Sequence, residues 1–249
     1  MCFSSSAALR ADAPVYFGGM PRTVGRPRGS ESPTGLGATQ DILFASAKLF
    51  ARSGYGSTTT HAIAEAAGLR QPSIYHHFGG KKEILLALLL GTVQPSLDVA
   101  EALLADPRPA PARLWALCAS DIALLSGGEV NLGELYLLPE LGDPIFAPFH
   151  GLRDQLVAAY RQLVNACDHP DPELGASLVI GLVESIILLR RRAPESIDEN
   201  TPAAFADAAL RMLGLEAPIV KRAGEQGRLL IGDVRAIADA WSGVSGAPA

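Results

Sequence analysis

The chain has 249 residues, of which 48% are hydrophobic and 19% are charged, so it is long enough to bury one or two cores and lacks the composition of a disordered chain. Its three scattered cysteines, Cys2, Cys118 and Cys167, argue against a disulfide framework or a zinc cluster and favour a reducing compartment. The net charge of −5 does not exclude a polyanionic partner, because residues 20–91 carry eight Lys or Arg against four Asp or Glu, whereas residues 92–249 carry twelve against twenty-one.

Residues 1–37 are rich in Gly, Ser, Pro and Arg and show no helical or strand period, which predicts a flexible arm. The first 19 residues lack the pattern of a secretory signal. The uninterrupted apolar runs are shorter than the roughly 20 residues that cross a bilayer. We therefore expect a cytoplasmic protein without a membrane partner. Arg26 and Arg28 lie in a Gly-Arg-Pro context, for which a minor-groove contact and a plain solvated tail both remain open.

Three short helices are predicted next. The first has apolar residues at helical spacing from Thr39, the expected N-cap, to Gly54, where we expect it to stop. A second helix over about 60–67 is expected to be capped by Thr59 and ended by Gly68, and a third spans about 71–77. The two-residue step between them permits only a sharp turn, which predicts a helix-turn-helix unit.

Small and apolar residues of the second and third helices are expected to face the core. The predicted buried face of the second helix consists of Ile63, Ala66 and Ala67. Alanine allows the third helix to approach closely. In that third helix, Ile74 and Phe78 are four residues apart and are expected to point inward. The polar residues around its start are therefore left to face outward.

The outward residues carry the chemistry that reads base edges in the major groove. Gln71 can form two hydrogen bonds with adenine, His76 can donate to guanine, and the Pro72 ring offers an apolar contact to a thymine methyl group. Donors suited to phosphate oxygens surround them: Thr60, Tyr75, His77 and Lys81. The pattern predicts binding to double-stranded DNA.

The rest of the chain is predicted to be helical, and no strand pattern competes. A fourth helix is expected from Glu83 to about Leu104, bent at Gly91 and Pro95. Further helices are expected near 110–126, 132–138, 145–166, 172–191 and 202–213, followed by a partly ordered C-terminal tail over 216–249. The predicted fold class is all-α, with a three-helix head over residues 38–91 and a larger helical body over residues 92–215.

The stretch GYGSTTTHAIAEAAGLRQPSIYHHFGGKKEIL, residues 54–85, resembles the signature of the TetR family of bacterial transcriptional regulators, and the resemblance extends over residues 39–90. It implies a homodimeric repressor, with neither cofactor nor enzymatic activity, that a small apolar effector releases from a palindromic operator. By the same resemblance, base-contacting positions are matched by His61, Gln71, Pro72 and His76. Phosphate-contacting or capping positions are matched by Thr60, Ser73, Tyr75, His77 and Lys81. Arg70 departs from the family pattern, which has a small capping residue there.

The acidic body shows no catalytic motif, phosphate loop or metal-ligand pair. Aromatic and polarizable side chains lie on successive predicted helices, and both core packing and the lining of an apolar ligand cavity remain open for Trp115, Cys118, Tyr136 and Phe149. Glu184 interrupts the apolar run LVIGLVESIILL; it could pair across a dimer, face the cavity or reach solvent. Small residues in the helices over 172–191 and 202–213 predict a four-helix dimer interface, since two recognition helices double the contact with DNA.

Four other functions remain open. An activator, or a regulator without a ligand, would share every residue of the head. A thiol-sensing regulator would depend on Cys118 or Cys167. An enzyme with an accessory DNA-binding head is the fourth, and the sequence offers no residues for its chemistry.

Overall fold

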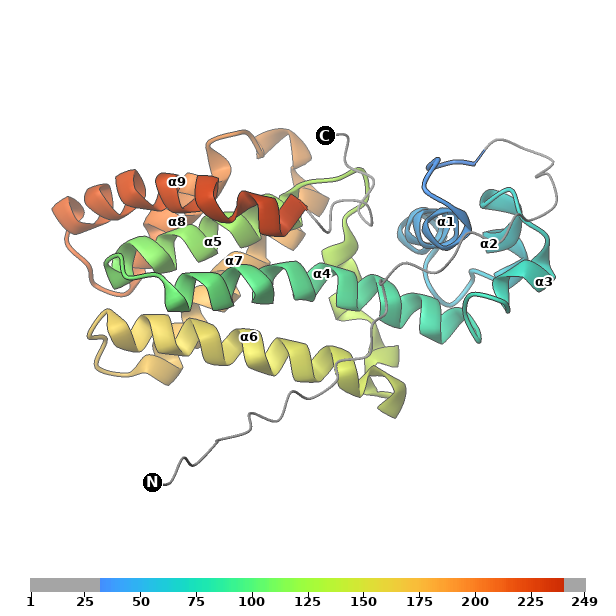
Figure 1. The fold of residues 1–249 in the computed structure, drawn as a ribbon, viewed down its shortest axis with the longest axis horizontal. Coiled ribbons are helices and arrows are strands. Elements are labelled where there is room, and N and C mark those ends of the chain that lie inside the picture. Colours follow the sequence, from blue (N-terminus) through green and yellow to red (C-terminus); the bar gives the residue numbers. More distant parts are fainter. Residues whose placement is uncertain (1–31, 240–249) are drawn as a thin grey trace, which may run out of the picture.

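The computed structural model describes residues 32–239, with side chains as far as Val234, and every element in this part is an α-helix or a short 3-10 helix. Figure 1 shows a small head with α1, α2 and α3 at one end and a larger helical body at the other. The long helix α4, Lys81–Ala105, begins in the head and continues through the body. The predicted all-α class is therefore confirmed. Arg26, Arg28 and Cys2 lie outside the described residues.

Helix α1, Ala38–Ser53, begins after a glycine and has no side-chain cap, so the prediction of Thr39 as N-cap is wrong. The Thr39 hydroxyl instead lies 3.0 Å from Nδ1 of His77, which ties the start of α1 to the segment after α3. The fully buried Asp41 anchors the end of the arm, because its Oδ2 accepts a hydrogen bond of 2.7 Å from the Ser32 hydroxyl. These contacts fix where the chain enters the head.

Helix α2, Thr60–Ala66, is capped as predicted, because Oγ1 of Thr59 accepts a hydrogen bond of 3.1 Å from the amide three residues later. Its buried face consists of Ile63, Ala64 and Ala67. The prediction for Ala66 is wrong, since this residue is exposed. Each helical residue turns by about 100°, so Ala64 reaches the core that Ile63 also faces while Ala66 turns away from it.

Gly68 has a φ of 65° and makes the turn after α2, since this left-handed backbone conformation favours glycine. Helix α3, Gln71–Ile74, is a single turn, so the predicted helix as far as residue 77 is too long. Its end is prolonged by turns in which the amide of Phe78 donates to the carbonyl of Ile74 at 2.9 Å. Ile74 is fully buried and Phe78 half-buried in the core of the head, as predicted.

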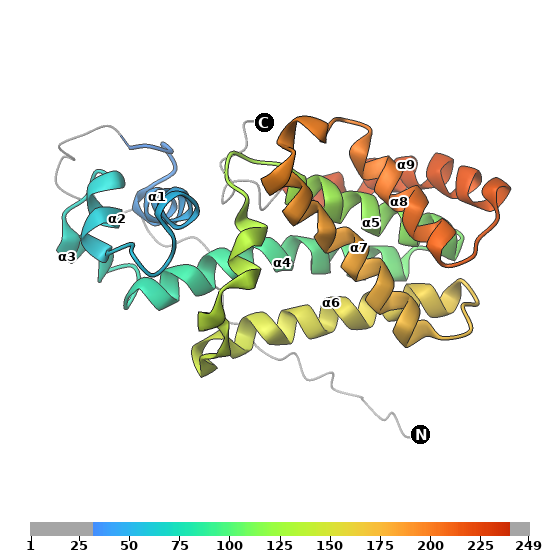
Figure 2. The same ribbon diagram turned by 180° about the vertical axis from the view of Figure 1, so that it is seen from behind.

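The body contains five helices besides the C-terminal part of α4. They are α5 (Ala110–Ser126), α6 (Ala147–Ala166), α7 (Pro172–Arg192), α8 (Thr201–Met212) and α9 (Ala217–Asp239). The 3-10 helices η1 (Leu132–Leu137), η2 (Pro139–Gly142) and η3 (Pro144–Phe146) connect α5 to α6, and η4 (Pro194–Ser196) follows α7. Helix α4 packs on α6, while α5 packs on α8 and α9 (Figures 1 and 2).

Helix α9 occupies residues 217–239 of the segment for which only a partly ordered tail was predicted, so the helical part is longer than the sequence indicated. Its glycines let α9 lie directly on Trp115 of α5: a Cβ atom added at Gly227 would overlap the indole ring. Trp115 is 1% exposed, and its Nε1 donates a 2.8 Å hydrogen bond to Asp207 of α8. Glycine lowers helix propensity, so the stability of α9 comes from this tertiary packing.

The core of the head continues into the body. Four residues of the η segment and of α6 belong to the same buried cluster as the side chains of α1 to α4: Leu135, Leu141, Phe146 and Phe149. An ion pair of 2.5 Å joins Lys82 of α4 to Asp143, and a second of 2.8 Å joins Lys48 of α1 to Glu129. The head is therefore packed against the segment that precedes α6 rather than carried on α4 alone.

By length and composition, α4 and α7 could each cross a membrane, although the uninterrupted apolar runs predicted no such helix. Within the fold, 61% of the most apolar stretch of α4 is buried, as is common for the core helix of a bundle. In α7 the corresponding share is 33%. Helix α7 thus leaves apolar side chains on the outside of the body.

Candidate functional site

The outer end of the head presents the side chains around α3. Gln71, Pro72, Tyr75 and His76 are exposed, whereas Ile74 between them is fully buried and holds the helix against α1 and α2. Proline fits the first turn because its missing N–H would have no partner within the helix. The predicted base-reading residues therefore share one solvent-facing surface.

Helices α2 and α3 meet through side chains of that surface. The Thr60 hydroxyl lies 3.4 Å from the Tyr75 hydroxyl, and Nε2 of Gln71 donates to the same Thr60 oxygen at 3.4 Å. Hydrogen bonds of this length are weak, so Gln71 is free to turn toward another partner at low cost. His61 is exposed one residue further along α2, and Ser73 is half-buried.

Lys81 is held within the head, whereas His77 is exposed and contacts Thr39 at the start of α1. Nζ of Lys81 donates to the carbonyls of Tyr55 at 2.6 Å, Gly56 at 3.2 Å and Thr58 at 2.9 Å. Its ammonium also lies 4.2 Å from the centre of the Tyr55 ring. All three ammonium protons thus have partners in the loop between α1 and α2, and a phosphate contact would have to replace one of them.

Arg70 occupies the N-cap position of α3 without making a side-chain cap, and its side chain is exposed. Among the described residues it forms no ion pair. Arg70 is thus a cation beside Gln71 that the sequence analysis treated only as a departure from a cap. A positive charge immediately before the predicted reading helix was the signal that makes Arg70 a candidate for a phosphate contact.

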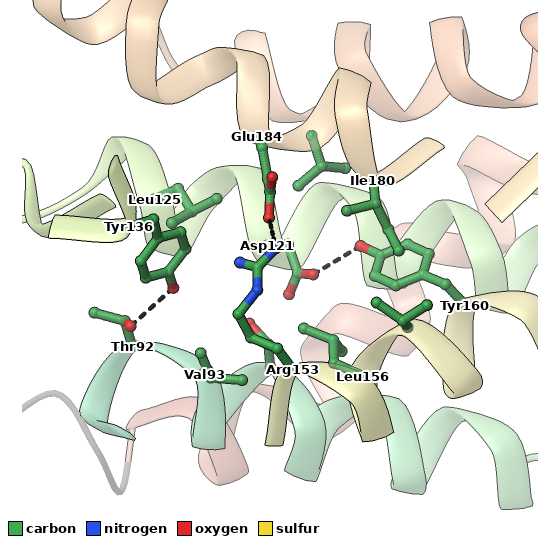
Figure 3. A pocket seen from close by; sticks show the side chains of 13 residues that line it. Thr92, Val93, Asp121, Leu125, Tyr136, Arg153, Leu156, Tyr160, Ile180 and Glu184 are labelled. Atoms are coloured by element: carbon green, nitrogen blue, oxygen red, sulfur yellow. Dashed lines mark hydrogen bonds and ion pairs between the residues drawn. The ribbon is translucent and has the colours of Figure 1, made fainter. Parts of the chain in front are cut away.

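A second site is a cavity inside the body, enclosed by α4, α5, α6, α7 and η1. Its volume is about 40 Å³, enough for about three water molecules. Figure 3 shows polar side chains from opposite walls meeting in it. The lining residues that matter for its chemistry are Thr92, Ser96, Asp121, Tyr136, Arg153, Tyr160 and Glu184.

Asp121 is the most deeply buried charged group of this cavity, with 4% of its surface exposed. Its Oδ2 accepts a 2.7 Å hydrogen bond from the Tyr160 hydroxyl, while the buried Oδ1 has no hydrogen-bond partner. Burial raises the pKa of the Asp121 carboxyl to about 6, against the lowering effect of the Tyr160 and Ser96 hydroxyls, and the Glu184 charge raises it further.

The other two charges of the cavity neutralise each other. Arg153 reaches from α6 to Glu184 of α7 with a contact of 2.5 Å, and its guanidinium carbon lies 5.0 Å from the centre of the Tyr136 ring. The Tyr136 hydroxyl donates to Oγ1 of Thr92 in α4 at 2.8 Å, and burial raises the pKa of this phenol to about 12. Glu184, for which three possibilities were open, faces the cavity (Figure 3).

Comparison with known proteins identifies the family. Residues 42–88 match the family model of bacterial regulatory proteins, tetR family. The crystal structure of Mycobacterium smegmatis AmtR is 38% identical, covers 92% of this chain and 100% of that chain, and superimposes with a TM-score of 0.69. The chain belongs to the TetR family. Its helix-turn-helix head is the part that the family model describes.

Two curated relatives resemble the head of this TetR-family protein. The HTH-type transcriptional repressor AcnR of Corynebacterium efficiens is 38% identical over 53 residues, which are 21% of this chain and 28% of that protein. The HTH-type transcriptional repressor KstR2 of Mycobacterium tuberculosis is 41% identical over 51 residues, 20% of this chain and 26% of that protein. The chain thus matches only about a quarter of the length of these relatives.

Among the predicted ligand-binding residues of this TetR-family body, only Tyr136 lines the cavity. Trp115 packs under α9, and Cys118 is fully buried in the core of the body. Phe149 lies behind Tyr136, with a distance of 5.5 Å between the ring centres. Asp121, Arg153 and Tyr160 were not predicted from the sequence. The available signal was a carboxylate within the apolar run of α5, comparable to Glu184 in α7.

Proposed function

We propose that this TetR-family protein is a transcriptional repressor that binds a palindromic operator as a homodimer in the cytoplasm and is released by a small effector. The exposed reading surface on α3, placed on a head that matches the family model, carries the proposal. AcnR and KstR2, whose DNA-binding heads resemble this one, are transcriptional repressors, which favours repression over activation. Family membership also favours a regulator over an enzyme.

In this proposal Gln71, Pro72 and His76 read base edges, and His61 reaches a neighbouring base from α2. Thr60, Ser73, Tyr75 and His77 contact phosphates and fix the register, together with Arg70. Their exposure at one end of the head supports these roles for all except Thr60 and Ser73, which are half-buried. Lys81 supports the loop before α2 from within the head.

The proposed dimer forms through the outer faces of α7 and α8. Exposed residues of α7 recur at spacings of four and three and form one stripe: Leu174, Leu178, Gly181, Ser185 and Leu188. Leu178 is 44% exposed and Leu188 41%, although both are apolar. Gly181 has open space where a Cβ atom would lie, so a second helix can approach closely.

Effector binding is proposed to act through Tyr136 and α4. Tyr136 lines the cavity and is hydrogen-bonded to Thr92 of α4. Its ring also lies against the tilted ring of Phe149, which belongs to the core of the head. A ligand that displaces the Tyr136 ring therefore changes its contact with α4 and its contact with Phe149, and both of these lead to the head. When both subunits of the dimer change in this way, the distance between the two DNA-binding heads changes. Fewer dimers then fit the operator. In this scheme residues 38–91 form the DNA-binding part, and the effector and dimer part runs from residue 92 through α9.

The thiol-sensing alternative is disfavoured. Burial raises the pKa of the Cys118 thiol far above its ordinary value and that of the Cys167 thiol to about 11, so neither forms the reactive thiolate at neutral pH. An activator and a regulator without a ligand share every feature of the head. Promoter assays with and without the operator, combined with a thermal-shift screen of small molecules, separate them from the proposed repressor.

The test of DNA recognition is selection of preferred duplexes from a random pool by the purified protein. We expect a two-fold symmetric consensus. Gln71→Ala should weaken binding to the selected duplex by about 1–3 kcal/mol and relax the preference at one position in each half-site. Gln155→Ala removes an exposed glutamine from α6 in the body and should leave binding unchanged. A consensus without symmetry, or equal binding by both variants, would refute the proposal.

The test of the dimer is a charge placed in the α7 stripe. Leu178→Glu should give monomers in sedimentation and lose high affinity for the operator, because a charge in an apolar interface must be desolvated. Leu229→Glu is the matched control, since Leu229 is 68% exposed on α9, away from the proposed interface. If Leu178→Glu remains dimeric, the interface lies elsewhere.

A further inference from the structure

The cavity of the body contains two carboxylates and one guanidinium, which makes it polar where the sequence predicted an apolar ligand. The guanidinium of Arg153 already has a partner in Glu184 and lies over the Tyr136 ring. Asp121 is therefore the one charged group of the lining that has no counter-ion there. Figure 3 shows it between the Arg153–Glu184 pair and Tyr160.

Only one of the two carboxylate oxygens of Asp121 lacks a hydrogen-bond donor. Oδ2 of Asp121 accepts from Tyr160 at 2.7 Å, and the Ser96 hydroxyl stands beside the carboxylate. Oδ1 is buried and no donor meets it in hydrogen-bond geometry. A buried carboxylate oxygen without a donor lowers the stability of the fold. A ligand that donates an N–H to this oxygen therefore removes that energetic cost.

We propose that the cavity binds the positively charged nitrogen of a small organic amine, an alkylammonium or amidinium group that donates a hydrogen bond to Oδ1 of Asp121. The inference rests on the proposed ligand-responsive function and names the ligand class of that site. The volume of about 40 Å³ accommodates the head group of such a ligand rather than a large molecule. The apolar side chains of Val93, Leu156 and Val157 line the space for the attached carbon atoms.

Other ligand chemistries fit this lining less well. A carboxylate would meet the charges of Asp121 and Glu184, and it would have to displace Glu184 to reach Arg153. A neutral apolar ligand would exclude water while leaving Oδ1 without a donor. A cation also gains from the ring of Tyr136, whose face already attracts the guanidinium of Arg153.

The experiment uses full-length protein at pH 7.5 and three probes that share a propyl chain: n-propylammonium, 1-propanol and butyrate, compared at equal ionic strength. Titration calorimetry and thermal shift report binding. We expect n-propylammonium to bind and to raise the unfolding midpoint, while 1-propanol and butyrate do neither. This comparison needs no variant, so it holds even if a substitution in the cavity prevents folding. Binding of butyrate or 1-propanol as tight as that of the amine, or no binding of the amine, would overturn the inference.

Asp121→Asn keeps the shape of the side chain and removes its charge, and it should weaken amine binding about 10- to 100-fold, the effect of losing one charge-assisted hydrogen bond. Asp154→Asn changes an exposed carboxylate of α6 and should bind the amine like the unmodified protein. Unchanged amine affinity in Asp121→Asn would place the amine elsewhere.

Binding to the selected operator duplex is measured on the same samples, so that two kinds of failure remain distinct. If the duplex is bound and the amine has no effect, the ligand inference fails and the regulator proposal stands. If no duplex is bound, the proposed function fails whatever the amine does.

Discussion

Replacing Asp121 by Asn should make the empty protein more stable at neutral pH. Asp121 is 4% exposed and its Oδ1 has no hydrogen-bond partner, so the folded state holds a carboxylate that is poorly compensated. Asparagine has nearly the same shape, and its side-chain oxygen can still accept the hydrogen bond from Tyr160. The substitution therefore removes mainly the burial of a charge.

The magnitude follows from the pKa. Burial, followed by the smaller effects of Tyr160, Ser96 and Glu184, changes the pKa of the Asp121 carboxyl from 3.8 to about 6. A shift of about two units corresponds to about 3 kcal/mol. Because the pKa is raised on folding, the protein has the full stability associated with this group below pH 4 and loses it as the pH rises through 6. Asp121→Asn should accordingly match the unmodified protein near pH 4 and exceed its stability by up to about 3 kcal/mol at pH 8.

Urea unfolding at a fixed protein concentration, followed by circular dichroism at pH 4.5, 6 and 8, measures this difference. Asp154→Asn, which changes an exposed carboxylate on α6, should show no such growth with pH. If the advantage of Asp121→Asn stays constant with pH, or if the variant becomes less stable than the unmodified protein as the pH rises, then Asp121 has a favourable partner and the reasoning is wrong.

Two further substitutions test contacts that only the folded chain creates. Lys81→Met should lower the unfolding free energy by about 2 kcal/mol, because three carbonyls lose their donor, while the salt dependence of operator binding stays the same. Lys221→Met, which changes an exposed lysine of α9, is the control. A salt slope reduced by about one in Lys81→Met would instead indicate a phosphate contact. Gly227→Ala should lower the free energy of unfolding measured in urea by about 1–3 kcal/mol, since its Cβ atom overlaps Trp115. Gly232→Ala on the same helix has open space at the Cβ position and should raise the free energy of unfolding by about 0.5–1 kcal/mol. Equal effects of the two alanines would show that α9 does not depend on the contact with Trp115.

Local signals in the sequence determined the elements of the head. The Thr59 cap and the positive φ of Gly68 depend on side chains and backbone within a few residues, so they were predicted correctly. The inward positions of Ile63 and Ile74 follow from helical period. The exposure of Gln71, Pro72 and His76 was predictable for the same reason, because the helical period turns them away from the core that Ile74 faces.

Tertiary structure decided what depends on residues far apart in the chain. Helix α9 contains several glycines and looks loosely patterned, yet it is ordered because those glycines let it reach Trp115 more than a hundred residues earlier. The partners of Lys81 and the charges around Asp121 likewise come from separate elements that only packing brings together. Helix propensity and period act over one or two turns, whereas the burial of a charge and the loss of its partners are properties of the assembled core.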